Sequence, residues 1–257
     1  YFSYSLSIDS DTVVIGAYGD VDNGVYSGSA YVYVRSNGVW SEQQKLTASD
    51  GAAGDNFGTS VSIDGDTAVI GAYADEDNGN YSGSAYVFVR SNGVWSELQK
   101  LTASDGAQNN YFGFSASIDG DTAVISAYGD ANSGSAYVFV RSNGVWSELQ
   151  KLTASDAASH DRFGRSVSID GDTAVIGNFS GGNDSGSAYV YVRSNGVWTE
   201  QQKLTASDGA QDDRFGISVS IDGDTAVIGA HGDDDNGSVS GSAYVYVRSN
   251  GVWSEQQ

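Results

Sequence analysis

Residues 57–72 read FGTSVSIDGDTAVIGA, and this stretch decides the fold. From Phe57 to Ile63, small polar residues alternate with β-branched apolar residues, as they do in a strand with two different faces. Asp64-Gly65-Asp66 is a tight-turn signal, and TAVIGA (67–72) is the returning strand. The stretch therefore predicts two antiparallel strands, here called A and B.

Two further strands are expected after an acidic, glycine-rich loop. GSAYVFVR (83–90) is apolar on both sides and forms strand C. Asn92-Gly93 suits a two-residue hairpin with positive φ at both positions. VWSELQKL (94–101) mixes Trp and Leu with Glu, Gln and Lys, as an outer, half-exposed strand D should.

The same unit occurs five times along the 257 residues. Its single tryptophan recurs at Trp40, Trp95, Trp146, Trp198 and Trp253. Repeats of this length made of short strands predict propeller blades, with approximate boundaries at 1–55, 56–110, 111–161, 162–213 and 214–257. We expect an all-β, five-bladed β-propeller with four antiparallel strands per blade, forming a single domain over 1–257. A β-solenoid is the main alternative, but it is built from parallel strands, and the hairpin turns demand antiparallel ones.

The ends of the chain bear on ring closure. The first repeat begins at strand A and the last stops within strand D, so no strand is left to complete a neighbouring blade. We therefore expect the first and last blades to pack through side chains, at a seam that is the weak point of the ring.

The composition excludes some classes of partner. Lys and Arg number 12 against 33 Asp and Glu, which gives a formal net charge of −21. A surface this acidic repels nucleic acid and anionic lipid, whereas cations, basic partners or plain solubility remain open. There is no cysteine, and no apolar span long enough to insert into a membrane.

The recurring motif resembles a known family. Phe-Gly-x-Ser-x-Ser-Ile-Asp-Gly-Asp-Thr-Ala-Val-Ile-Gly-Ala, followed by Ser-Gly-Ser-Ala-Tyr-Val and Val-Trp-Ser-Glu-Gln-Gln-Lys-Leu-Thr-Ala, is similar to the FG-GAP repeat, closest to its bacterial branch. The resemblance covers essentially the whole chain and implies a propeller in an extracellular or cell-surface protein. It is more distant to the propeller of integrin α-subunits, which has seven blades.

The calcium loop of the integrin branch does not carry over. Its long Asp-x-Asp-x-Asp-Gly connection between strands A and B is reduced here to Asp-Gly-Asp, as in Asp64-Gly65-Asp66. Two carboxylates on a tight turn are too few for the six to eight oxygens of calcium. We interpret these aspartates as turn residues.

One face of an up-and-down propeller carries its D-to-A and B-to-C loops, and we call it the loop face. The opposite face carries the A-to-B and C-to-D turns and is called the turn face. Eight acidic residues lie in the D-to-A loops and ten in the B-to-C loops, against Arg162, Arg165 and Arg214 as expected nearby cations. If the propeller has a working face, we expect it to be the loop face.

Three of the B-to-C loops place carboxylate and amide oxygens before a flexible glycine. This spacing suits Ca²⁺, although a solvated acidic loop is the alternative. The candidate metal residues are Asp20, Asp22, Asn23, Asp75, Asp77, Asn78, Asp233, Asp235 and Asn236.

Repetition of the unit favours multivalent binding over catalysis. His160 and His231 are each unique to one repeat and lie in no catalytic motif, so we expect no enzyme. Five similar sites suit a repetitive ligand, such as a glycan or a protein surface, and we expect a multivalent extracellular adhesion module that uses calcium if the candidate metal residues bind it. Tyrosines in or beside the B-to-C loops are candidates for stacking on sugars, with core packing as the alternative: Tyr18, Tyr26, Tyr73, Tyr81 and Tyr128.

The alternative function is a structural repeat or spacer of a surface or fibre protein that self-assembles and has no small-ligand site.

Overall fold

The computed structural model, which describes residues 2–180, 184–235 and 237–256, contains twenty strands in five sheets. In every sheet the hydrogen-bonded order follows the chain order, so each repeat forms one four-stranded antiparallel blade on its own. The Asn-Gly hairpins join strands C and D with positive φ at both residues, as at Asn92 and Gly93. The prediction of five four-stranded blades is confirmed.

The strands of each blade, in the order A to D, have the following bounds. Blade 1 contains β1 (Ser5–Asp9), β2 (Thr12–Ala17), β3 (Ser29–Ser36) and β4 (Val39–Leu46). Blade 2 contains β5 (Ser60–Asp64), β6 (Thr67–Ala72), β7 (Ser84–Ser91) and β8 (Val94–Leu101). Blade 3 contains β9 (Phe112–Asp119), β10 (Thr122–Ala127), β11 (Ser135–Ser142) and β12 (Val145–Leu152). Blade 4 contains β13 (Phe163–Asp170), β14 (Thr173–Asn178), β15 (Ser187–Ser194) and β16 (Val197–Leu204). Blade 5 contains β17 (Phe215–Asp222), β18 (Thr225–Ala230), β19 (Ser242–Ser249) and β20 (Val252–Glu255).

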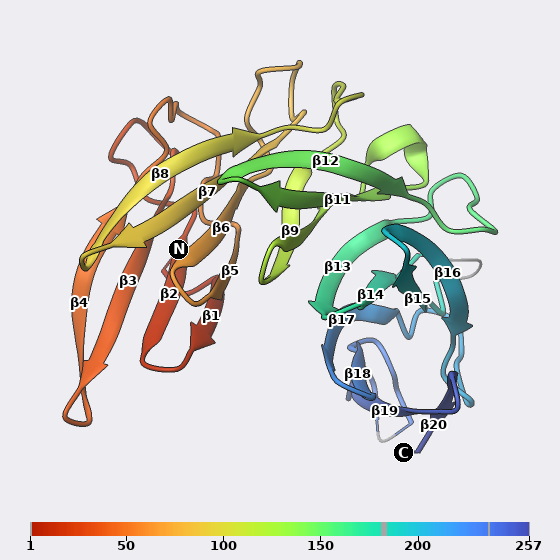
Figure 1. Cartoon of the computed structure of the whole chain (residues 1–257). Coiled ribbons are helices and arrows are strands. Elements are labelled where there is room, and N and C mark those ends of the chain that lie inside the picture. The colour runs from red at the N-terminus through yellow and green to blue at the C-terminus, as the bar shows by residue number, and fades with distance from the viewer. Residues whose placement is uncertain (1, 181–183, 236, 257) are drawn as a thin grey trace.

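The blades follow one another around an arc, with their A strands inside and their D strands outside (Figure 1). The B-to-C loop of blade 3 contains a single turn of 3₁₀ helix, η1 (Asp130–Asn132). Within the described residues, no helix has the length and apolar character needed to cross a bilayer.

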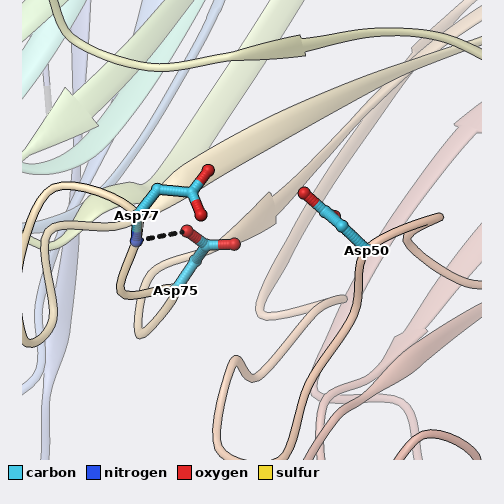
Figure 2. A group of neighbouring side chains, drawn as sticks. All are labelled: Asp50, Asp75 and Asp77. Atoms are coloured by element: carbon cyan, nitrogen blue, oxygen red, sulfur yellow. Dashed lines mark hydrogen bonds between the residues drawn. The ribbon is translucent and has the colours of Figure 1, made fainter.

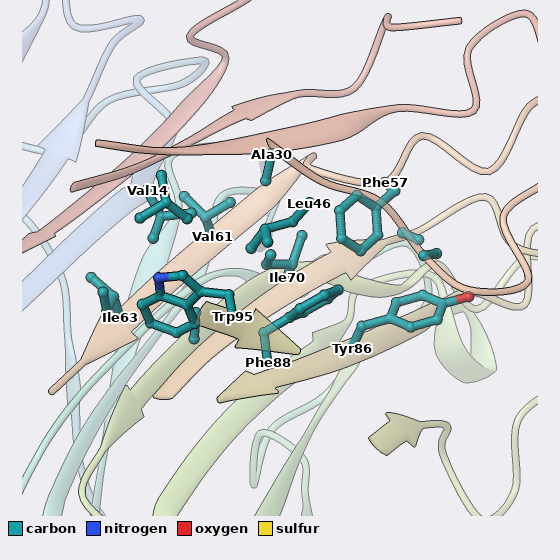
Figure 3. Close-up of a cluster of buried hydrophobic side chains, with 14 residues drawn as sticks. Val14, Ala30, Leu46, Phe57, Val61, Ile63, Ile70, Tyr86, Phe88 and Trp95 are labelled. Carbon is teal, nitrogen blue, oxygen red and sulfur yellow. The ribbon is translucent and has the colours of Figure 1, made fainter. Parts of the chain in front are cut away.

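Each junction between consecutive blades is a hydrophobic core made from two unlike faces. At the first junction, blade 1 contributes small and aliphatic side chains such as Val14 and Leu46 (Figure 3). Blade 2 contributes mainly large side chains, among them Phe57, Tyr86 and Trp95. We call the aromatic face of a blade, which meets the preceding blade, its leading face, and the opposite face its trailing face. Burying apolar area between faces supplies the main stabilisation of the arc.

Hydrogen bonds across each junction fix how the blades dock. The backbone N–H of Phe57 donates to the carbonyl of Ser27 at 3.0 Å, and the same bond recurs at the other three junctions. The side-chain amide of Gln44 bonds both the N–H and the C=O of Trp95, at 2.9 and 2.8 Å. On the turn face, Arg90 donates to Thr12 of the preceding blade at 2.9 Å. The same guanidinium forms an ion pair of 2.6 Å with Asp66, so an aspartate of the A-to-B turn helps to hold this contact.

Strand D of blades 1 to 4 contains a β-bulge, and in blades 1 and 4 the bulge residue is a glutamine that bonds across the junction. In blade 1 the ladder shifts between Val32 and Tyr33, which leaves Gln43 without an opposite residue. Its side chain accepts a hydrogen bond of 3.0 Å from the indole Nε1 of Trp95 in blade 2. In blade 2 the bulge residue is Leu98, and the buried indole N–H of Trp146 has no hydrogen-bond partner.

The arc does not close. Four hydrophobic clusters connect consecutive blades, and in the described part of the chain no cluster joins blade 5 to blade 1. Phe2 is 56% exposed and Trp40 39%, whereas their counterparts in the other blades are buried. On the trailing face of blade 5, Val227 is 41% exposed. The expectation that the first and last blades pack together is wrong, because four near-identical junctions turn the chain by similar steps and five blades do not complete a circle.

The bulge residues give a direct test of the junction. Leu98→Gln should supply the acceptor that Trp146 lacks and stabilise the protein by about 1 kcal/mol, the typical net value of one hydrogen bond. The converse variant, Gln43→Leu, should destabilise it by a comparable amount or more, because it strands the indole N–H of Trp95. Both free energies of unfolding would be measured by chemical denaturation. A Leu98→Gln variant no more stable than the parent would contradict this description of the junction.

Candidate functional site

The loop face is assembled at the junctions between blades. The D-to-A loop that enters one blade pairs with the B-to-C loop of the blade before it: the N–H of Asn56 donates to the carbonyl of Tyr26, and that of Tyr111 to the carbonyl of Tyr81. Residues of the two loop types therefore lie side by side. The sequence-based assignment of both loop types to one face agrees with this arrangement.

A lysine lies among the carboxylates of the loop face in blade 2. Carboxylate oxygens of Asp50, Asp75 and Asp77 approach within 4.8 Å of one another (Figure 2). The ammonium of Lys100, at the end of strand D, lies 2.8 Å from Asp50, 2.9 Å from Asp75 and 2.5 Å from Asp77. Asp75 also accepts hydrogen bonds from Ser84, from the N–H of Asp77 and from the hydroxyl of a tyrosine on strand C.

The same arrangement recurs in three other blades. Lys45 contacts Asp20 and Asp22 in blade 1. The corresponding pairs in blades 3 and 4 are Lys151 with Asp105 and Asp130, and Lys203 with Asp156. In each blade the lysine also lies over the ring of a strand-C tyrosine. We call each group a lysine cluster.

Ionisation equilibria in the lysine clusters favour the charged forms. Burial opposes ionisation of Asp20, but hydrogen bonds from Ser29, Tyr31 and Lys45 outweigh it and lower the pKa of Asp20 to about 2. Burial likewise opposes the ammonium of Lys100, yet its three aspartate partners raise the pKa of this lysine above its usual value. The cation in each cluster is therefore a protonated lysine at neutral pH.

Asp50, Asp75 and Asp77 lie close enough together to hold a metal ion, and the last two are predicted calcium ligands. In blades 1 and 2 the predicted aspartates do come together, but the oxygens of Asp75 already accept four donors, including Lys100. Calcium would have to displace that ammonium to gain its oxygen shell. Asn23 and Asn78 lie beside the clusters, where their backbone N–H groups bond Ser27 and Ser82.

Blade 5 contributes the carboxylates of a corresponding cluster. The position equivalent to Lys100 would be 258, outside residues 1–257. Tyr244 donates to Asp208 at 2.8 Å and to Asp233 at 2.9 Å. The charges of neighbouring aspartates, Asp233 first, raise the pKa of Asp235. Asn236, the remaining predicted ligand, lies outside the described residues.

Sequence reasoning missed the lysines because it counted only residues within the loops. The sequence analysis expected only three arginines as cations beside the acidic residues of the loop face. This set was wrong because it omitted the lysines of strand D. The signal was present: strand D ends at the loop face, and Lys45, Lys100, Lys151 and Lys203 each follow the repeat's tryptophan by five positions. A long side chain near the end of a strand reaches the adjoining loops.

Aromatic rings surround the inner part of the loop face, in the places where the candidate tyrosines were predicted. Tyr18, Tyr26, Tyr73 and Tyr81 line an open pocket of about 390 Å³. Tyr26 and Tyr81 are 45% and 44% exposed, so their surfaces are accessible to a ligand. Four of the five candidates also contact another ring. The centroid distances are 4.8 Å for Tyr18 with Tyr4, 5.6 Å for Tyr73 with Phe114, and 5.7 and 5.0 Å for Tyr81 and Tyr128 with Tyr111. Packing between rings therefore accompanies the exposure of Tyr26 and Tyr81.

Among the hydrogen bonds of the described residues, each histidine side chain has one partner. His160 Nδ1 lies 3.0 Å from the hydroxyl of Ser159, and His231 Nε2 lies 3.4 Å from Arg214. His160 also lines a pocket with Tyr111 and Tyr128.

Comparison with known proteins agrees with the repeat geometry. Five segments match the model of the FG-GAP repeat, at residues 1–33, 40–88, 95–139, 146–191 and 198–246. The chain belongs to the FG-GAP repeat family. From the second segment onward, each match runs from strand D of one blade to strand C of the next, so the FG-GAP unit spans a junction. No curated protein is detectably similar to the chain. FG-GAP propellers are binding or structural modules, and this chain is one of them.

Replacing one lysine tests whether it takes the place of a metal. Lys100→Met keeps the length of the side chain but leaves three carboxylates without a cation, and should cost about 2 kcal/mol, less than a fully buried pair because the site is partly solvated. Millimolar CaCl₂ should then raise the melting temperature of the variant, since an ion bound only by the folded state stabilises it.

The matched control is Lys203→Met, whose blade offers one ion-pair partner, Asp156. It should lose less stability and show no calcium response. If calcium and EDTA shift the unmodified protein as strongly as Lys100→Met, calcium binds beside the lysine and the interpretation of the clusters is wrong.

Proposed function

We propose that the chain is a non-catalytic binding module of an extracellular or cell-surface protein, whose loop face takes a repetitive ligand such as a glycan. The observation that supports this most is a series of open pockets at successive blade positions on one face. One is lined by Tyr18 and Tyr73, a second by Tyr111 and Tyr128, and a third by Phe179.

The chemistry of the pockets suits a polyhydroxylated ligand. Aromatic rings provide flat apolar surface for sugar rings, and the amides of Asn56 and Asn109 lie beside them in two of the pockets. The pockets are shallow and open, which matches a chain lying across several blades. Several weak contacts on one rigid arc then add to a higher avidity.

The proposal does not require calcium. A protonated lysine already forms ion pairs with loop carboxylates in each of blades 1 to 4, so these loops have a cation of their own. It also assigns no catalytic role to His160 or His231. Their contacts include no carboxylate orienting the ring beside a nucleophile, as acid–base catalysis of acyl transfer would need.

The exposed tyrosines test this proposal. Tyr26→Ala and Tyr81→Ala should each weaken binding to a responding polysaccharide about three- to tenfold, because each removes a stacking surface without opening the core. Affinity electrophoresis against a panel of neutral and acidic polysaccharides provides the measurement. The control is Tyr33→Ala, a tyrosine lining the apolar pocket on the leading face of blade 1. No retardation by any polysaccharide, or equal loss in the control, would contradict the proposal.

A structural role in assembly is the second candidate, favoured by the two unpartnered blade faces. The leading face of blade 1 forms an open apolar pocket of about 380 Å³ lined by Phe2, Ile8 and Trp40 among others. Exposed apolar patches of this kind mark interaction surfaces. The trailing face of blade 5 carries Val227 and Thr225, the counterparts of residues that receive a leading face at every internal junction.

One residue weakens the fit between the leading face of blade 1 and the trailing face of blade 5 in a second copy of the chain. Ser3 occupies the place of Gly58, Gly113, Gly164 and Gly216. A Cβ at Gly58 would lie 2.3 Å from the carbonyl oxygen of Ser29 in the preceding blade. End-to-end association through blade 1 should therefore be weak until this side chain is removed.

Sedimentation measurements over a range of concentrations test the assembly role. The unmodified chain should associate weakly, Ser3→Gly more strongly, and Ile8→Asp not at all, because the new charge would be buried in the contact. Val21→Asp, at an equally exposed apolar residue of a B-to-C loop, is the matched control and should leave association unchanged. A strictly monomeric Ser3→Gly variant at millimolar concentration would exclude this candidate.

A further inference from the structure

Basic residues are scarce in this acidic chain, and most of them are already paired. Of the 12 Lys and Arg residues, nine form ion pairs with aspartates: four lysines on the loop face and five arginines on the turn face. Arg162, Arg165 and Arg214 form no ion pair within 4.0 Å among the described residues. In a molecule with a formal charge of −21, three unpaired arginines in one region call for a physical explanation.

The three arginines gather on the loop face at blades 4 and 5. Arg162 and Arg214 line one open pocket of about 590 Å³ together with Phe179. Arg165, at the start of β13, lies 5.7 Å from the centroid of the Phe179 ring. Arg162 also lines the neighbouring pocket of about 280 Å³ that contains Tyr128, so it connects the two.

Aromatic rings hold two of these guanidinium groups but do not satisfy them, and Nη1 of the third, Arg214, lies 3.4 Å from Nε2 of His231. Arg165 lies over Phe114 at 4.4 Å, and Arg162 over Tyr128 at 5.5 Å and Phe179 at 5.9 Å. A guanidinium stacked on a ring keeps its in-plane N–H donors free for an oxygen ligand. Burial lowers the pKa of Arg165, yet arginine remains protonated at any physiological pH.

Nearby acidic groups do not neutralise the region. Asp161 and Asp184 line the larger pocket, but neither approaches an arginine closely enough to form an ion pair. The carboxylate of Asp161 is buried and accepts the N–H of Ala158 at 2.9 Å. Asp184 contacts Arg214 through its backbone carbonyl, which accepts the N–H of that arginine. Arg162 and Arg214 therefore line the pocket without a partner carboxylate, and Arg165 lies beside them against the ring of Phe179.

We infer that Arg162, Arg165 and Arg214 form an anion subsite for a carboxylate-bearing sugar, so that the ligand of the loop face is an acidic glycan. This inference rests on the function proposed above. Apart from Ala158 and Gly129, the two pockets are lined by aromatic, polar or charged side chains, which suits sugar hydroxyls and a carboxylate. An acidic peptide would also present apolar side chains, and these pockets offer them little aliphatic surface.

Oligogalacturonate and its fully methyl-esterified form test the subsite, because they share one sugar backbone and differ only in charge. The unmodified chain should bind the acid at least tenfold more tightly than the ester by isothermal titration, as expected for a charge-assisted hydrogen bond. The variant Arg162→Gln/Arg214→Gln should bind both forms with the affinity of the ester. Arg248→Gln, at a paired arginine of the turn face, should retain the preference. Added NaCl should weaken binding of the acid more than binding of the ester.

The outcomes separate this inference from the proposed function. Equal affinity of the unmodified chain for acid and ester overturns the anion subsite and leaves the glycan-binding proposal standing. A preference that persists in Arg162→Gln/Arg214→Gln removes these arginines from the site. Failure of both forms to bind overturns the subsite for this ligand class, while the polysaccharide panel decides the broader proposal independently.

Discussion

The structure depends on one backbone hydrogen bond that is repeated at every junction, from the N–H of the FG phenylalanine to the carbonyl of a serine in the preceding blade. It is 3.0 Å long between Phe57 and Ser27, and recurs at the three other junctions. The phenylalanine ring is fully buried at the same point, so one residue provides both a hydrogen bond and apolar packing between two blades. A flexible glycine follows because a Cβ at Gly58 would collide with the neighbouring backbone.

This junction also creates the candidate site. It brings the D-to-A loop of one blade against the B-to-C loop of the previous one, and the aromatic pockets and lysine clusters lie along that contact. Two charge arrangements result on one face. In the clusters, lysines form ion pairs with aspartates of the protein, whereas the arginines around Arg162, the proposed anion subsite, form none among the described residues. A shared scaffold with local substitutions thus gives similar but unequal pockets.

Most of the fold could be predicted because its signals are local. Alternation in residues 57–63, the Asn-Gly hairpins and the fivefold repeat identified the strands, their pairing and the blade. The loop face and its tyrosines also followed from topology. The angle between blades is not local, since it results from packing of complete faces, and ring closure was therefore mispredicted. The lysine clusters were missed because Lys100 lies on strand D, and only the pairing of strands C and D brings it back to the B-to-C loop that carries Asp75 and Asp77.

The open arc is tested most directly by distances between spin labels, because the chain has no cysteine of its own. Val39, Val197 and Val252 occupy the same exposed position at the start of strand D in blades 1, 4 and 5. Pulsed electron paramagnetic resonance would compare the pair Val39→Cys/Val252→Cys with the pair Val197→Cys/Val252→Cys. The open arc predicts a clearly longer distance between blades 1 and 5 than between blades 4 and 5. Equal distances would show a closed five-bladed ring and contradict the account.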